Sequence, residues 1–125
     1  HKHGGSIIMT SSLSGYNANF IGGGPSPVCA YGTAKAGISE MARYMAAGLA
    51  PYGIRVNTIS PGYVWSGIHE GVMDKAGHDM CLEVVPIKRF GTPDELHGTL
   101  LFLASDASSY ITGINIPIDG GYSIY

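Results

Sequence analysis

The sequence has few charged residues, no long hydrophobic run and no basic cluster, and each shortage excludes a class of protein. Charged residues make up 13% of the 125-residue chain, against about 25% in typical globular domains, so we expect further protein to cover part of its surface. No run of 18 apolar residues occurs, so we expect no membrane span. The seven lysine and arginine residues form no patch and the net charge is −2, so no nucleic-acid partner is indicated.

Several sequence motifs of enzymes and metal sites are also absent. The glycines at 22–24 lack the Gly-x-Gly-x-x-Gly spacing of a dinucleotide fingerprint and are interpreted as part of an irregular loop. No Gly-x-Ser-x-Gly elbow occurs, which argues against a serine hydrolase. The histidines, aspartate and cysteine of segment 69–81 match no standard zinc spacing, so no metal site is expected. Cys29 and Cys81 lie in unlike contexts, and unpaired thiols favour a reducing, cytoplasmic setting.

The alternation of apolar runs and helical patterns predicts the order strand, helix, strand, helix, strand. The expected elements are a strand at 6–10, a helix from 28 to about 52, a strand at 54–60, a helix from 92 to about 104 and a strand at 113–118. Long helical connections imply parallel strands, and Pro117 places the last strand at a sheet edge. Three strands are too few for a doubly wound sheet, so we expect partner strands upstream, in a longer chain.

The helix expected over 28–52 is apolar or small on nearly all sides, which predicts that both of its sides are covered. One apolar stripe consists of Ala34, Ile38, Met41, Met45 and Leu49. The opposite side carries small residues and little charge. We therefore expect one side to face a sheet and the other a helix of a second subunit, in a homodimer or homotetramer formed through this helix.

Tyr31 and Lys35 lie one helical turn apart at the start of this helix, so their side chains share a face. A phenol has a pKa of about 10, and a neighbouring ammonium group lowers that pKa because it favours the phenolate. The pair can therefore act as a general acid and base. The alternative is an ordinary exposed tyrosine and lysine on a helix face.

Ser12 directly follows the C-terminal end of the first strand. Ligands of open α/β sheets bind at the carboxyl ends of the strands, and the second strand ends at the same edge in a Pro61-Gly62 turn. A serine hydroxyl there can hydrogen-bond a substrate carbonyl or hydroxyl oxygen. The alternative is that Ser11, Ser12 and Ser14 are ordinary loop serines.

A series of short motifs, which includes Ser12 and the Tyr31–Lys35 pair, extends along nearly the whole chain, from Gly4 to Gly121. They are TSS at 10–12, YGTAK at 31–35, IRVN at 54–57 with PG at 61–62, RFGTPDE at 89–95, FLASD at 102–106, TG at 112–113 and DGG at 119–121. This series resembles the short-chain dehydrogenase/reductase family. The resemblance implies an α/β, Rossmann-like, doubly wound parallel sheet, of which residues 1–125 are the C-terminal catalytic part of one domain and the N-terminal cofactor-binding part is absent.

The resemblance also implies roles for individual residues. Tyr31 matches the family's catalytic acid/base, Lys35 the residue that lowers the tyrosine pKa and binds the nicotinamide ribose, and Ser12 the residue that holds the substrate oxygen. The implied cofactor-binding residues are Tyr31, Lys35, Pro61, Gly62, Val64 and Ser66, with backbone groups of Val64 meeting the carboxamide. The family's glycine-rich loop and catalytic asparagine have no counterpart in this sequence.

Two segments of the sequence concern the substrate. Ser12 and Tyr31 are 19 residues apart, more than is usual in the family, and the longer loop leaves Ser14 as a rival for the serine role. The segment from Trp65 to Val85 resembles the family's mobile lid, where Trp65 and His69 are candidates for substrate contact.

We therefore expect an NAD(P)-dependent oxidoreductase that interconverts a secondary alcohol and a ketone, with NADP preferred over NAD. A polyol or ketose substrate is expected from the resemblance to fungal mannitol and sorbose reductases. The alternatives are a 3-oxoacyl thioester reductase and, in another class, a catalytically inactive fragment or assembly module.

Overall fold

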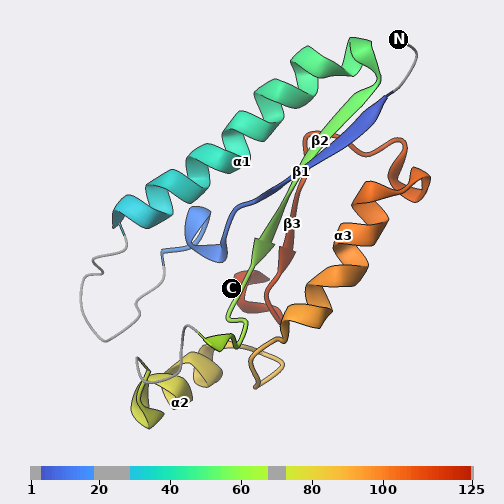
Figure 1. The fold of residues 1–125 in the computed structure, drawn as a ribbon. Helices are drawn as coiled ribbons and strands as arrows, with labels where there is room; N and C mark the ends of the chain where they lie inside the picture. Colours follow the sequence, from blue (N-terminus) through green and yellow to red (C-terminus); the bar gives the residue numbers. More distant parts are fainter. Residues whose placement is uncertain (1–3, 19–28, 68–72, 125) are drawn as a thin grey trace.

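The computed structural model describes residues 4–18, 29–67 and 73–124, and three parallel strands form its centre (Figure 1). The strands β1 (Gly5–Thr10), β2 (Ile54–Pro61) and β3 (Asn115–Ile118) lie side by side in the order β1-β2-β3. The helix α1 (Cys29–Leu49) lies on one side of the sheet and α3 (His97–Ala104) on the other. The helix α2 (Lys75–Val84) lies beyond the carboxyl ends of the strands. The predicted parallel strands and their order with the two long helices are confirmed.

The strand β2 lies in the middle of the sheet, and both of its faces are covered. Residues 56–60 are all buried, and β2 pairs with β1 on one side and β3 on the other. Within the described residues β3 pairs only with β2, so the edge position predicted from Pro117 is confirmed. Proline is tolerated there because an edge strand leaves alternate N–H positions without a partner.

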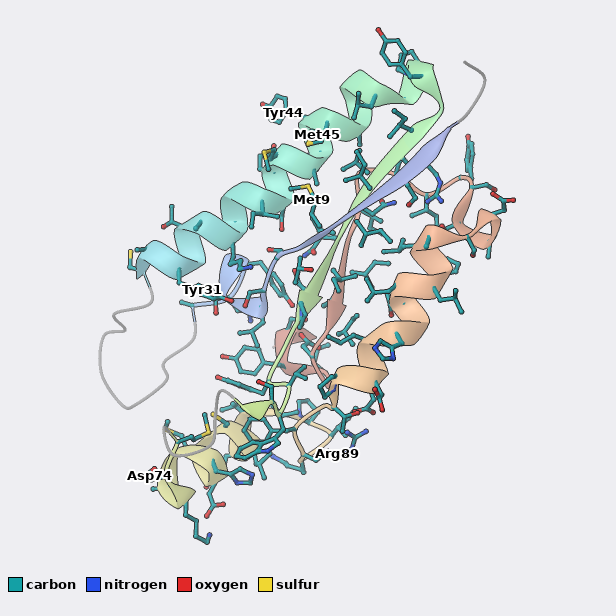
Figure 2. All side chains as sticks on the ribbon, viewed as in Figure 1. Met9, Tyr31, Tyr44, Met45, Asp74 and Arg89 are labelled. Carbon is teal, nitrogen blue, oxygen red and sulfur yellow. The ribbon has the colours of Figure 1, made fainter. Side chains whose placement is uncertain are left out.

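The face that α1 buries differs from the predicted stripe. Ala42 and Ala46 pack with Val56 in the core, and Met45 and Leu49 contact that cluster from its margin. Ala34 and Met41 of the predicted stripe are exposed in this chain, so the stripe coincides only in part with the side of α1 that meets the sheet. Small side chains let the helix backbone approach the sheet closely, so the larger residues lie at the flanks of the contact. Figure 2 shows Met9 and Met45 between α1 and the sheet and Tyr44 on the outer side.

The second predicted helix is divided in two. Residues Pro93–Leu96 form a 3-10 turn, and α3 begins at His97. The predicted capping box is confirmed, because Thr92 and Glu95 satisfy one another's backbone groups at its start. Among the described residues, no helix is both long enough and apolar enough to cross a membrane.

A buried amide holds the segment before β3 against β2. The side-chain N–H of Asn57 donates to the carbonyl oxygen of Ile111 at 3.0 Å, and its side-chain oxygen accepts from the N–H of Ile114 at 3.1 Å. The Asn57 side chain is fully buried, so its removal leaves backbone groups of the 111–114 segment without these bonds in a dry environment.

We predict that Asn57→Ala lowers the free energy of unfolding by about 2 kcal/mol, because it leaves buried polar groups unpaired. Chemical denaturation measures the change, with Ser109→Ala, at an exposed position, as the control. Equal stability of the two variants would show that this amide does not fix the approach to β3.

Candidate active site

The turn after β1 presents Ser12 at the carboxyl edge of the sheet. Ser12 is the N-cap of the 3-10 turn η1 (Leu13–Gly15), and its Oγ accepts a hydrogen bond from the N–H of Ser14 at 3.2 Å. Ser12 is 9% exposed, whereas Ser14 is half-buried. Because this bond uses the oxygen of the Ser12 hydroxyl as acceptor, its proton stays available for donation to another oxygen.

Two glycines let this turn lie directly against the start of α1. A Cβ atom at Gly15 would fall 2.9 Å from the backbone of Lys35 and Ala36, and one at Gly32 would fall 2.8 Å from the carbonyl oxygen of Ser14. Both distances are too short for any side chain larger than hydrogen. The backbone of the turn with Ser12 therefore packs directly against the backbone of the helix with Tyr31.

Lys35 joins the helix to the end of β1. Its Nζ donates to the carbonyl oxygen of Thr10 at 3.0 Å and lies 5.6 Å from the centre of the Tyr31 ring. The Ser11 hydroxyl donates to the carbonyl oxygen of Lys35 at 2.7 Å, and the Ser39 hydroxyl donates to Ser11 Oγ. These bonds fix the ammonium group beside the phenol, as the spacing of the two residues predicts.

Tyr31 is 48% exposed at the start of α1, beside the turn that follows β1 (Figure 2). About half of its surface is therefore accessible to a small molecule. Two other tyrosines lie near this edge, and partial burial raises the pKa of Tyr16 to about 12 and also raises the pKa of Tyr63. Among these three phenols, Tyr31 alone has an ammonium group against its ring.

The end of β2 forms the next wall of the site. The N–H of Gly62 donates to the carbonyl oxygen of Ile118 at 2.9 Å. A Cβ atom at Gly62 would lie 2.6 Å from Asp119 Cα, so only glycine fits between Pro61 and Tyr63. The missing side chain lets the turn after β2 pack directly against the residue that follows β3.

The backbone of Val64 continues this wall. It forms a parallel bridge with Gly91, in which the N–H of Trp65 and the carbonyl oxygen of Tyr63 make the two hydrogen bonds to Gly91. The N–H and carbonyl of Val64 itself therefore point to the opposite side. A donor and an acceptor on one residue complement the carboxamide that the family resemblance places here.

Arg89 and Glu95 hold the other side of this bridge. The Arg89 guanidinium donates to both carboxylate oxygens of Glu95, at 2.7 and 2.6 Å, and Glu95 also accepts from the N–H of Thr92 at 2.8 Å. The Arg89 guanidinium and the Thr92 N–H together lower the pKa of Glu95 to about 2. The carboxylate is thus charged in the folded protein at every ordinary pH.

The candidate substrate residues on the lid are only partly described. Trp65 is 38% exposed, and its ring meets those of His78 and Phe90 edge-on. Ser66 is half-buried, and His69 lies outside the described residues. No group of three metal-ligating side chains occurs in residues 4–18, 29–67 and 73–124.

The sequence pattern missed the roles of Gly15 and Gly32, although a glycine within a helix, where alanine is more stable, is a signal of close contact.

The comparisons with known proteins show the family and the fold of the chain. A family model described as enoyl-(acyl carrier protein) reductase matches residues 1–123. A crystal structure of a short-chain type dehydrogenase/reductase from Mycobacterium marinum superposes with a TM-score of 0.89 at 43% identity, over 99% of this chain and 46% of that one. The chain belongs to the short-chain dehydrogenase/reductase family.

Two curated members of the short-chain dehydrogenase/reductase family are similar over almost the whole chain. D-arabinitol 2-dehydrogenase (ribulose-forming) of Candida tropicalis is 44% identical over 97% of this chain and 43% of its own length. The NADP-dependent mannitol dehydrogenase of Hypocrea jecorina is 40% identical over 95% of this chain and 42% of its own length. The chain thus spans less than half the length of these relatives and corresponds to the C-terminal portion of the family's Rossmann fold, as predicted.

We predict opposite effects from two glycine-to-alanine changes in α1. Gly32→Ala forces η1 away from the helix and lowers stability, because its Cβ meets the Ser14 carbonyl oxygen. Gly37→Ala, whose Cβ meets nothing within 4 Å, raises stability by about 0.5–1 kcal/mol through helix propensity. Urea denaturation of both variants measures the difference. Stabilisation by Gly32→Ala would contradict the close approach of turn and helix.

A second prediction concerns the Arg89–Glu95 pair at low pH. The folded-state pKa of Glu95, about 2, lies below the unfolded value of about 4.3, so the pair stabilises the fold above pH 4.3 and loses this effect as the pH falls toward 2. The difference in free energy of unfolding between the native protein and Glu95→Gln is therefore expected to become smaller as the pH falls across this range. Denaturant midpoints at pH 6 and pH 3 test this, with Glu83→Gln as control. A constant difference between native protein and Glu95→Gln would refute it.

Proposed function

We propose that the whole protein is an NAD(P)-dependent oxidoreductase that interconverts a secondary alcohol and a ketone, with NADP preferred and a polyol or ketose as substrate. The observation that carries this proposal is the placement of Tyr31, Lys35 and the Ser12 turn at one edge of the sheet, fixed by the glycine contacts and the Lys35–Thr10 bond. Relatives named for arabinitol and NADP-dependent mannitol oxidation support the substrate class and cofactor.

In this proposal Tyr31, Ser12 and Lys35 have different roles in the reaction at one substrate oxygen. During ketone reduction the phenol of Tyr31 donates its proton to that oxygen, while the Ser12 hydroxyl hydrogen-bonds it and holds it in place. The Lys35 ammonium stabilises the phenolate that remains on Tyr31. In alcohol oxidation the same groups act in reverse. The bound nicotinamide supplies or accepts the hydride.

The chain's residues fit the nicotinamide end of such a cofactor. Gly62 lets the turn after β2 pack directly against Asp119, the backbone of Val64 offers one donor and one acceptor, and Lys35 supplies a cation for ribose hydroxyls. Pro61 and Ser66 complete the proposed cofactor wall. Ser14 and Trp65, with His69, are proposed to contact the rest of the substrate.

We also propose that α1 joins subunits of a homodimer or homotetramer in the cytoplasm. Tyr44 and Met41 on its outer side are 75% and 48% exposed, and large apolar side chains in this position favour a partner surface. The free cysteines Cys29 and Cys81 suit a reducing compartment.

The test uses the chain as given and a form extended through its upstream sequence to the length of its relatives. Both are assayed for NADPH and NADH oxidation with a panel of ketoses and a 3-oxoacyl thioester. We expect ketose turnover with NADPH from the extended form. Turnover of the thioester alone would favour the acyl reductase, and no cofactor oxidation by either form would contradict an enzymatic role.

In the extended form, Tyr31→Phe is expected to lower kcat by about 10²–10⁴-fold, because the proton donor is lost, while NADPH binding, followed by fluorescence, persists. The matched control is Tyr110→Phe, which removes the same hydroxyl from a fully exposed position. Unchanged turnover in Tyr31→Phe would remove the proposed mechanism.

A further inference from the structure

The carboxylate of Asp119 is the centre of the turn that follows β3. Its Oδ1 accepts a hydrogen bond from the N–H of Gly121 and its Oδ2 from the N–H of Ser123, both at 3.0 Å. Gly120 and Gly121 have φ values of +64° and +87°, which side chains disfavour, so the backbone wraps around this one carboxylate. The carboxylate is thus oriented by hydrogen bonds from its own turn.

Tyr16 contacts this carboxylate from the other side of the site. Its hydroxyl donates to Asp119 Oδ2 at 3.3 Å. Tyr16 ends the η1 turn, where its backbone N–H donates to the carbonyl oxygen of Leu13 at 3.2 Å. Because Tyr16 lies only four residues beyond Ser12 and is tied to the same turn, the position of its ring constrains the position of the Ser12 hydroxyl.

Asp119 also touches the wall proposed for the nicotinamide. A Cβ atom at Gly62 would lie 2.6 Å from both Cα and Cβ of Asp119, and the Gly62 N–H is bonded to the residue before Asp119. Asp119, which directly follows β3, is therefore in contact with both the turn after β1 and the turn after β2. The three strand ends that build the site meet at Asp119.

We propose that Tyr16 and Asp119 are positioning residues, whose hydrogen bond sets the place of the Ser12 turn relative to the Pro61-Gly62 turn. Neither contacts the substrate in this account; both act through Ser12. The inference rests on the proposed oxidoreductase function. Burial raises the pKa of Tyr16 to about 12, with the Asp119 charge adding to the rise and a hydrogen bond from Ser123 opposing it, so the phenol stays a donor throughout the pH range of an enzyme assay.

The main test is Tyr16→Phe in the upstream-extended protein, because phenylalanine keeps the ring and removes only the hydroxyl. We expect kcat for the ketose to fall about tenfold, since small misplacements of a catalytic group are costly, while the KM for the nicotinamide cofactor stays within about twofold. Asp119→Asn, which retains an acceptor but not the charge, is expected to lower kcat in the same direction. Tyr110→Phe is the matched control, with unchanged kcat.

A second readout does not depend on activity. Hydrogen exchange of the η1 amides, whose bonds run from Gly15 to Ser12 and from Tyr16 and Asn17 to Leu13, is expected to become about tenfold faster in Tyr16→Phe, with exchange in β2 unchanged. Unchanged η1 exchange overturns the inference whether or not the protein is active. Faster η1 exchange with unchanged kcat overturns the positioning role. Absence of turnover in the unaltered protein instead overturns the proposed function, which separates the two failures.

Discussion

The close approach of the η1 turn to the first turns of α1 is the constraint on which the site depends. The contact exists because Gly15 and Gly32 have no side chains where the two backbones meet, and the bond from Lys35 to Thr10 holds it from the strand side. Without this contact, nothing would hold the segment of Ser12 next to the segment of Tyr31. With it, a strand end and a helix start become one rigid surface that can present two hydroxyls to one molecule.

The rest of the fold supports this contact. Buried alanines bring α1 onto β2, and β2 places the Gly62 turn at the same sheet edge as the η1 turn. The turn after β3 then meets both through Asp119. Parallel strands concentrate their carboxyl ends at one edge, so three short segments far apart in sequence supply the residues of the proposed site.

Much of this was predictable from the sequence. The apolar runs indicated the strands, the Thr92 and Glu95 pair indicated a helix start, and the spacing of Tyr31 and Lys35 placed them on one face. The buried face of α1 was not predictable from apolar periodicity, because hydrophobicity favours methionine over alanine whereas close packing favours the smaller residue. The Tyr16–Asp119 bond joins residues 103 positions apart, a pairing that only the topology of the sheet reveals.

The central claim is that the hydroxyls of Tyr31 and Ser12 act on one substrate oxygen. A crystal structure of the upstream-extended protein with NADP and an unreactive substrate analogue tests it most directly. Both hydroxyl oxygens are expected within about 2.6–3.2 Å of the same analogue oxygen, as proton transfer requires. An analogue bound at this edge with either hydroxyl directed elsewhere would contradict it.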